Sequence, residues 1–111
     1  MPETTVATSL QVPSYSSGNS TTLECSGQLP GPPDPTGAGS LTFTSNPIDN
    51  TQGTFAFDPN TITNIVFDMS ASPATFTCNV TVTRTDPGRS GAKMGWDPFT
   101  VDVNVTYPIP Q

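Results

Sequence analysis

Residues 99–107, with the sequence FTVDVNVTY, alternate apolar and polar side chains without a break. Every second position is apolar, namely Phe99, Val101, Val103, Val105 and Tyr107. Successive side chains of a β-strand point to opposite faces, so this pattern indicates a strand with one buried and one exposed face, as is common in antiparallel sheets.

The preceding segment, residues 75–83 (TFTCNVTVT), alternates in the same way. Five shorter strands are predicted at residues 6–12, 21–25, 41–44, 54–57 and 62–69. Their core candidates are Leu23, Phe43, Phe55, Phe57, Ile65, Phe67 and Met69. Thr, Val and Phe suit a half-buried pleated surface. We therefore predict an all-β domain of about seven antiparallel strands, formed by residues 1–111 as one unit.

The segments between these strands read as turns. Residues 29–39, LPGPPDPTGAG, are predicted to form a loop without secondary structure of its own. Asp precedes Pro at Asp34, Asp58, Asp86 and Asp97, which is typical of turns.

The balance of charge excludes several classes of partner. The chain has three Lys and Arg residues against nine Asp and Glu, a formal net charge of −6. Such a chain repels phosphate backbones and anionic membranes, so no nucleic acid is expected as a partner. No apolar run approaches the roughly 18–20 residues of a spanning helix, so membrane insertion is not expected. Residues 1–20 lack the pattern of a signal peptide.

The two cysteines lie in segments that carry a family resemblance. Cys25 stands in GNSTTLECSG (residues 18–27) and Cys78 in ATFTCNVTV (residues 74–82), which resemble the second and sixth strands of immunoglobulin-like domains. The resemblance implies a two-sheet sandwich with an inter-sheet disulfide between Cys25 and Cys78, formed in an oxidising setting. The chain departs from that family at Phe76, where tyrosine is usual. It also lacks a tryptophan near residues 41–44 and has Ser72 in place of an acidic residue.

Catalytic chemistry is not expected, and the chain is predicted not to be an enzyme. The sequence contains no histidine, so neither a Ser-His-Asp nor a Cys-His arrangement can be built. Lys93 is the only lysine. No cofactor and no metal site are predicted. The alternative we weighed is calcium bound where the loops of Asp34, Asp86 and Asp97 would converge at one end of the fold.

A partner contact is predicted in residues 85–98, TDPGRSGAKMGWDP. The only cations of the chain, Arg84, Arg89 and Lys93, lie within or next to this segment, as do Met94 and the only tryptophan, Trp96. Long loops between strands often carry function, and Trp and Arg are enriched at binding hot spots. The alternative is that Trp96 folds back onto the rim of the domain while the cations only solvate an exposed tip.

These patterns favour a non-enzymatic structural or binding protein. The first hypothesis is a virion component, such as a capsid decoration protein, located at the virion surface. Its partner would be a protein surface of a capsid or cell-surface lattice, and an oligomer of the chain is one further option. The alternatives are an extracellular ectodomain of an adhesion or recognition protein, and a carbohydrate-binding module that stacks sugars on Trp96 and Tyr107.

Overall fold

The computed structural model describes residues 2–86 and 94–111, and within them the chain forms seven β-strands and one short 3-10 helix. In chain order the elements are β1 (Glu3–Val12), β2 (Ser20–Leu29), η1 (Pro35–Ser40), β3 (Thr42–Thr44), β4 (Ile48–Asn50), β5 (Gly53–Asp68), β6 (Ala74–Arg84) and β7 (Phe99–Pro108). The strands form one sheet in the order β3-β7-β1-β2-β6-β5-β4, and every neighbouring pair is antiparallel. The all-β prediction is confirmed.

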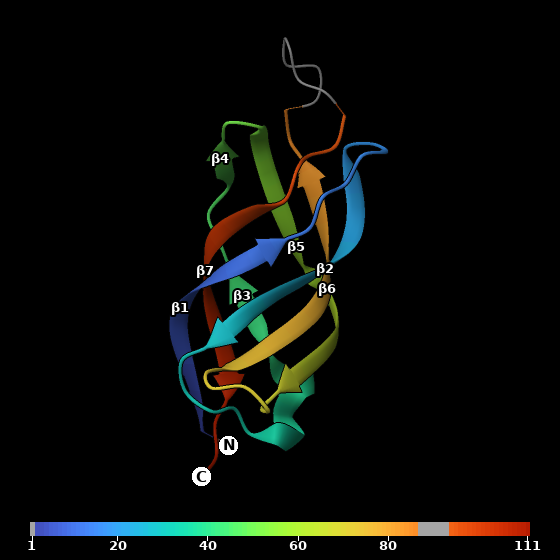
Figure 1. Cartoon of the computed structure of the whole chain (residues 1–111). Helices are drawn as coiled ribbons and strands as arrows, with labels where there is room; N and C mark the ends of the chain where they lie inside the picture. The colour runs from blue at the N-terminus through green and yellow to red at the C-terminus, as the bar shows by residue number, and fades with distance from the viewer. Residues whose placement is uncertain (1, 87–93) are drawn as a thin grey trace.

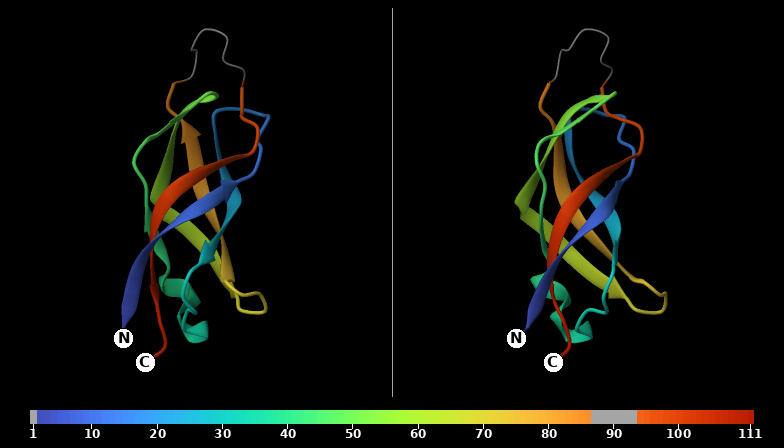
Figure 2. Two further views of the ribbon diagram at one scale, coloured as in Figure 1. Left: turned by 60° about the vertical axis from the view of Figure 1, so that its left-hand side comes forward. Right: turned by 90° about the vertical axis from the view of Figure 1, so that its left-hand side faces the viewer.

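The sheet curls so that its two halves face each other (Figures 1 and 2). One ribbon contains β3, β7 and β1, and the other contains β2, β6, β5 and β4. The ribbons are joined by a short β1–β2 ladder, in which Leu10 pairs with Gly27 and Gln11 with Ser26. At the far edges, residues 45–47 connect β3 to β4. The ring of Phe43 on β3 lies 6.1 Å from that of Phe57 on β5, so the edges also meet through side chains.

The core fills the space between the ribbons and follows from the alternation in the sequence. Every second residue of β6 is buried, and the intervening residues are half-buried threonines and an asparagine. The buried apolar side chains of β6 and β7 are Ala74, Phe76, Cys78, Val80, Val82, Val101, Val103, Val105 and Tyr107. This inner face supplies most of the hydrophobic stabilisation, since apolar burial contributes about 25 cal/mol per Å².

The immunoglobulin-like sandwich expected from the resemblance is not found. In that fold the second and sixth strands belong to different sheets. Here β2 and β6 are hydrogen-bonded neighbours over their full lengths, from Ser20 opposite Thr83 to Leu29 opposite Ala74. The alternating pattern identified the inward face of β6 and β7 correctly, but Met69, expected in the core, is 43% exposed and lies just beyond the end of β5. The pattern also does not state which strand lies alongside.

The cysteines accordingly sit in a different relation from the one expected. Cys25 and Cys78 face each other across adjacent strands, both fully buried and both as free thiols. The expected inter-sheet disulfide is therefore absent from this structure. Burial raises the pKa of the Cys25 thiol to about 12, with a further contribution from Cys78, and burial also raises the pKa of Cys78 to about 11.

Three further expectations change. The segment expected to be a plain loop contains η1, whose first turn is capped by the carboxylate of Asp34 accepting from the Thr36 amide at 3.0 Å. The two strands predicted at residues 54–57 and 62–69 are one strand, β5, whose pairing with β6 shifts register on both sides of Thr63. The three-residue strand β4 was not predicted.

Candidate interface at the β6–β7 connection

The β6–β7 connection leaves β6 and returns through residues 94–98 at the end of the molecule opposite the two chain termini (Figure 1). It has to pass from one ribbon to the other because β6 pairs with β2 and β7 pairs with β1. The β1–β2 connection and the β4–β5 hairpin lie at the same end (Figure 1). We call this the crossover end, and its residues determine how the predicted contact segment is held.

Arg84, the last residue of β6, is buried at the start of the connection with 3% of its surface exposed. Its guanidinium donates through Nη1 to the Gln52 carbonyl at 2.5 Å and through Nη2 to the Gly95 carbonyl. The same group lies 5.1 Å from the centre of the Phe55 ring and 3.7 Å from the Asp86 carboxylate. These contacts offset the cost of burying the charge, and they bring three segments together around one side chain.

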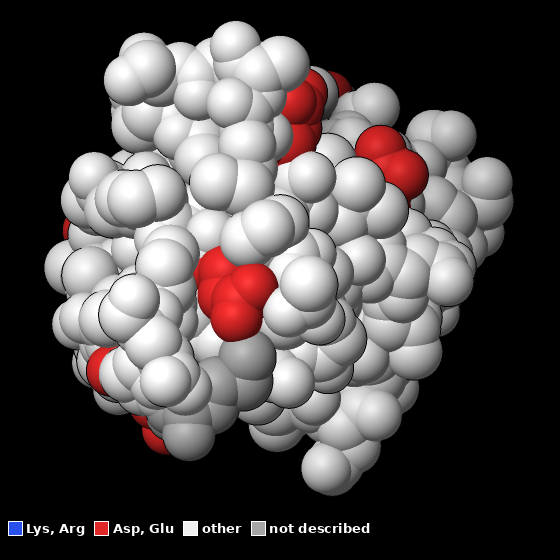
Figure 3. Space-filling view, turned by 90° about the horizontal axis from the view of Figure 1, so that it is seen from below, with Lys and Arg blue, Asp and Glu red and all other residues white. Residues whose placement is uncertain are grey.

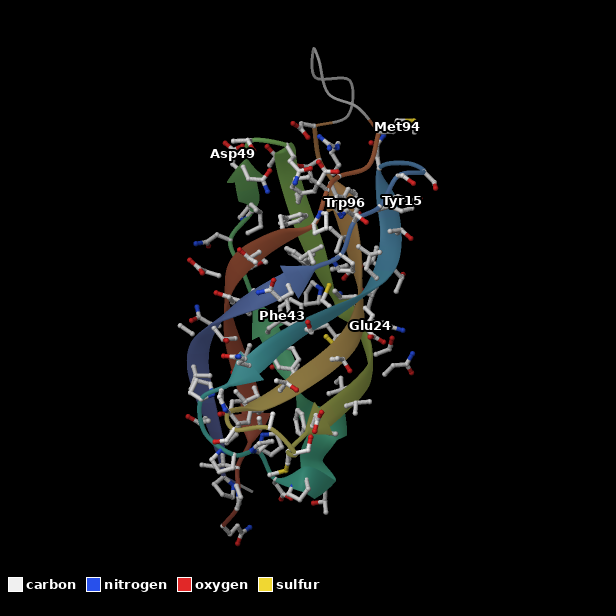
Figure 4. All side chains as sticks on the ribbon, in the orientation of Figure 1. Tyr15, Glu24, Phe43, Asp49, Met94 and Trp96 are labelled. Atoms are coloured by element: carbon white, nitrogen blue, oxygen red, sulfur yellow. The ribbon has the colours of Figure 1, made fainter. Side chains whose placement is uncertain are left out.

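Trp96 holds the other end of the connection and is also buried, with 2% of its surface exposed. Its indole Nε1–H donates to the Pro13 carbonyl at 3.0 Å. Its backbone exchanges hydrogen bonds with Tyr15 at 2.7 and 3.0 Å, forming an isolated β-bridge to the β1–β2 connection. The ring lies 5.2 Å from Tyr15 and 5.4 Å from Phe55, which extends the core to this end (Figure 4).

Gly95 and Gln52 complete this arrangement. Gly95 has φ 76°, and a Cβ there would collide with the carbonyl oxygen of Tyr15, so the bridge requires glycine. The side-chain amide of Gln52 pairs with the backbone of Asp97, donating to its carbonyl at 3.0 Å and accepting from its amide at 2.6 Å. We call Arg84, Trp96, Gln52 and Gly95 the loop clamp.

The structure thus separates the predicted contact residues into two groups. Arg84 and Trp96 belong to the loop clamp and present almost no surface to a partner in this structure. Met94 lies between them along the chain and is 60% exposed (Figure 4). Arg89 and Lys93 lie outside the described residues. A partner contact by Arg89, Lys93 and Met94 stays a prediction, whereas Trp96 has the position expected of the alternative, folded back onto the domain.

The aspartates proposed for calcium do not converge. Asp34 caps η1 at the terminal end and donates its backbone amide to the Pro108 carbonyl at 2.9 Å, whereas Asp86 and Asp97 lie at the crossover end. The proposed loop cluster is therefore wrong in its geometry. Within the ranges that the structure describes, no group of three or more His, Cys, Asp or Glu residues could hold a metal ion.

The sugar-stacking platform of Trp96 and Tyr107 is not present either. Tyr107 is fully buried, and its hydroxyl donates to the Gly31 carbonyl at 2.9 Å near the terminal end. The two rings therefore lie at opposite ends of the molecule and face inward.

The sequence did not point to Gln52, Tyr15 or Gly95. Folding brings Gln52 and Tyr15 to the contact segment from elsewhere in the chain, whereas Gly95 lies within the segment. Only Gly95 carried a signal, since glycine marks turns and is the residue that most readily adopts a positive φ. Comparison of the chain with protein-family models, curated proteins and solved structures found no match. Among the described residues, no helix has the length and apolar character needed to span a membrane.

Proposed function

We propose that this chain is a non-enzymatic structural protein of a surface lattice, most specifically a virion decoration component, and that it attaches through its crossover end. The observation that carries the proposal is the loop clamp. It fixes both ends of a connection whose intervening residues include Arg89, Lys93 and the exposed Met94. Fixed ends lower the entropy that a loop loses when it docks on a surface.

The distribution of charge supports attachment at this end. Arg84, Arg89 and Lys93 are the only cations of a chain whose net charge is −6, and all three belong to the crossover end or its connection. Seen from the terminal end, the described surface shows carboxylates scattered among uncharged residues and no lysine or arginine (Figure 3). An acidic lattice would therefore attract one end of the molecule and repel the rest of it.

The revised contact differs from the one predicted from sequence. Trp96 no longer serves as the anchor, because its ring is enclosed by Tyr15 and Phe55. Met94 takes the role of the apolar contact, and Arg89 and Lys93 keep the role of steering.

The test is to purify particles from the source culture on a density gradient and to quantify this chain in each fraction by mass spectrometry. The proposal expects the chain to sediment with capsid-sized particles. Purified Arg89→Ala/Lys93→Ala protein should rebind to stripped particles less well than wild type, and 0.5 M salt should narrow that difference, since the Debye length is then only about 4 Å. Recovery of the chain only with cell envelopes would instead favour the ectodomain alternative, and recovery only as free protein would contradict both.

A further inference from the structure

A polar hollow of about 650 Å³ opens where β1 and β2 separate. Both strands have ten residues, but their ladder is limited to Leu10 with Gly27 and Gln11 with Ser26. Beyond it β1 follows β7 and β2 follows β6, so the two strands diverge (Figure 1). Where the ladder ends, the hydroxyl of Thr8 donates to the Gln28 carbonyl at 2.9 Å and holds the two strands together.

The hollow has an unusual chemical character. Seven of its nine lining residues, from β1, β2 and β6, are Ser, Thr or Gln, and none is charged. The side chains of Ser9, Gln11 and Gln28 are exposed, and those of Ser26 and Thr77 are half-buried. Hydroxyl and carboxamide groups both donate and accept hydrogen bonds, so this surface matches a ligand whose groups do the same.

Gly27 and Phe76 form the floor of the hollow. A Cβ at Gly27 would lie 2.7 Å from the Phe76 ring and 3.1 Å from the Ser9 carbonyl oxygen, so glycine allows the ring to pack directly beneath the strand. Phe76 is fully buried, which makes the floor part of the rigid core. The polar groups above it are therefore positioned in advance on strands, which favours specific recognition.

We propose that this hollow binds a neutral oligosaccharide. A sugar presents closely spaced hydroxyl groups that both donate and accept, as the lining does. An anionic ligand would find no cation in the hollow and would meet a chain of net charge −6, and a cationic ligand would find no carboxylate in the lining. The volume lies within the range of about 300–1,000 Å³ that is usual for small-molecule sites.

The binding is weak, because each polar contact replaces a contact with water and the lining offers no exposed aromatic ring for stacking. We expect dissociation constants of roughly 1 mM. The site lies on the outer face of the joint between the ribbons and uses none of the loop-clamp residues. Sugar binding at the hollow is therefore independent of whether the chain attaches through its crossover end.

The experiment is a titration of the ¹⁵N-labelled full chain followed by ¹H–¹⁵N correlation spectra. The probes are cello-, malto-, xylo- and chito-oligosaccharides. A sulfated oligosaccharide is titrated in parallel as an anionic comparison. At least one neutral probe should shift amide signals around Ser9, Ser26 and Gln28 in a saturable way, and the sulfated probe should not.

Variants of the lining and a control variant outside it make the test specific. Gln11→Ala/Gln28→Ala should weaken binding of that probe about tenfold, the equivalent of one or two net hydrogen bonds. Thr22→Ala, on the outer face of β2 but outside the hollow, should leave it unchanged. Thr77→Ala provides a second lining variant if the double variant melts at a lower temperature than wild type. Absence of saturable shifts at the hollow with every neutral probe overturns the proposal, as does equal weakening by Thr22→Ala.

Discussion

Arg84 is a buried cation whose role in the structure is to hold three chain segments together. Its guanidinium bonds the carbonyls of Gln52 and Gly95 and lies near the Asp86 carboxylate. A planar group with five donors suits this geometry, and an ammonium group does not. Its Nε–H has no hydrogen-bond partner, so the group is not fully compensated. The contribution of Arg84 to stability therefore comes mainly from the carbonyls that would lose a hydrogen-bond donor if Arg84 were replaced.

Replacing Arg84 with methionine should lower the free energy of unfolding by about 2–4 kcal/mol, because the carbonyls of Gln52 and Gly95 lose a hydrogen-bond donor and the nearby Asp86 carboxylate loses a cation. Arg84→Lys should lower the free energy of unfolding by less than the methionine variant does, but by a measurable amount. One ammonium group does not reproduce the two hydrogen bonds that the planar guanidinium donates. Urea unfolding followed by circular dichroism measures both. A methionine variant as stable as wild type would show that the clamp contributes nothing at this position.

Gly95 and Gly39 provide a test position and its control for an alanine substitution. Gly95 has a positive φ and no room for a Cβ beside Tyr15, whereas a Cβ at Gly39 meets nothing within 4 Å. Gly95→Ala should therefore cost about 1–3 kcal/mol or more from backbone strain and displacement of Tyr15, and Gly39→Ala should be close to neutral. Thermal melting of the two variants checks this, and similar melting temperatures would contradict the described bridge between Tyr15 and Trp96.

The two buried thiols should be unreactive in the folded chain. Iodoacetamide at pH 8 should leave native protein unmodified and should add two groups per chain in denaturant without reductant, because Cys25 and Cys78 are free but fully buried. Intact mass spectrometry reads the result. A chain that stays unmodified in denaturant until reductant is added would be disulfide-bonded, contrary to this structure.

The raised thiol pKa values also predict a dependence of stability on pH. The folded-state values of about 12 and 11 exceed the ordinary value of 9.0, so above pH 9 the unfolded chain releases protons that the folded chain retains. This contribution to stability is complete below pH 9 and is lost as the pH rises through the folded-state values. Cys25→Ala/Cys78→Ala should show a shallower loss of stability over that range in urea unfolding. Equal slopes would mean that the thiols are not desolvated.

At the scale of the elements, the sequence predicted the positions of the strands better than the order in which the strands pair. The alternation of β6 and β7 comes from one buried face and is therefore visible locally. Pairing is not local: nothing in the residues of β2 states whether β6 lies beside it or across the core. Gln52 of the loop clamp and Tyr15, the bridge partner of Trp96, were missed for the same reason, since both reach the connection only after folding. The strand β4 was missed because its three residues, Ile48–Asn50, contain only one apolar side chain and so show no alternation.

The neighbour relation of β2 and β6 has a direct test. Thr22 and Thr81 face each other on the outer surface with their hydroxyl oxygens 3.0 Å apart. In an immunoglobulin-like sandwich these positions would lie on the outer faces of opposite sheets. We expect Thr22→Cys/Thr81→Cys protein to form an intramolecular disulfide under mild oxidation, since facing positions on adjacent strands bring the two Cβ atoms close enough to be bridged.

The matched control is Thr22→Cys/Thr106→Cys, which places the second cysteine on β7 in the other ribbon. It should not form an intramolecular disulfide. Both variants are best made with Cys25 and Cys78 replaced by alanine, and non-reducing mass mapping identifies the bonds. A bond in the control with none in the Thr22–Thr81 variant would contradict the strand order.

At the scale of the whole molecule, the fold gives the chain two unlike ends. The crossover end carries the connection with the cations and the exposed Met94, and the terminal end carries η1 and both termini (Figures 1 and 3). The central claim is that buried residues hold both described ends of the connection, so that Trp96 is not available to a partner, and a contact by Met94, Arg89 and Lys93 stays a proposal.

The fluorescence of Trp96 tests this claim most directly, because it is the only tryptophan of the chain. An indole that is 2% exposed and packed between Tyr15 and Phe55 should emit at short wavelength and resist quenching by acrylamide until the protein is unfolded. Emission typical of an exposed indole, freely quenched in the folded protein, would show that the clamp is open and would return Trp96 to the surface as a contact residue.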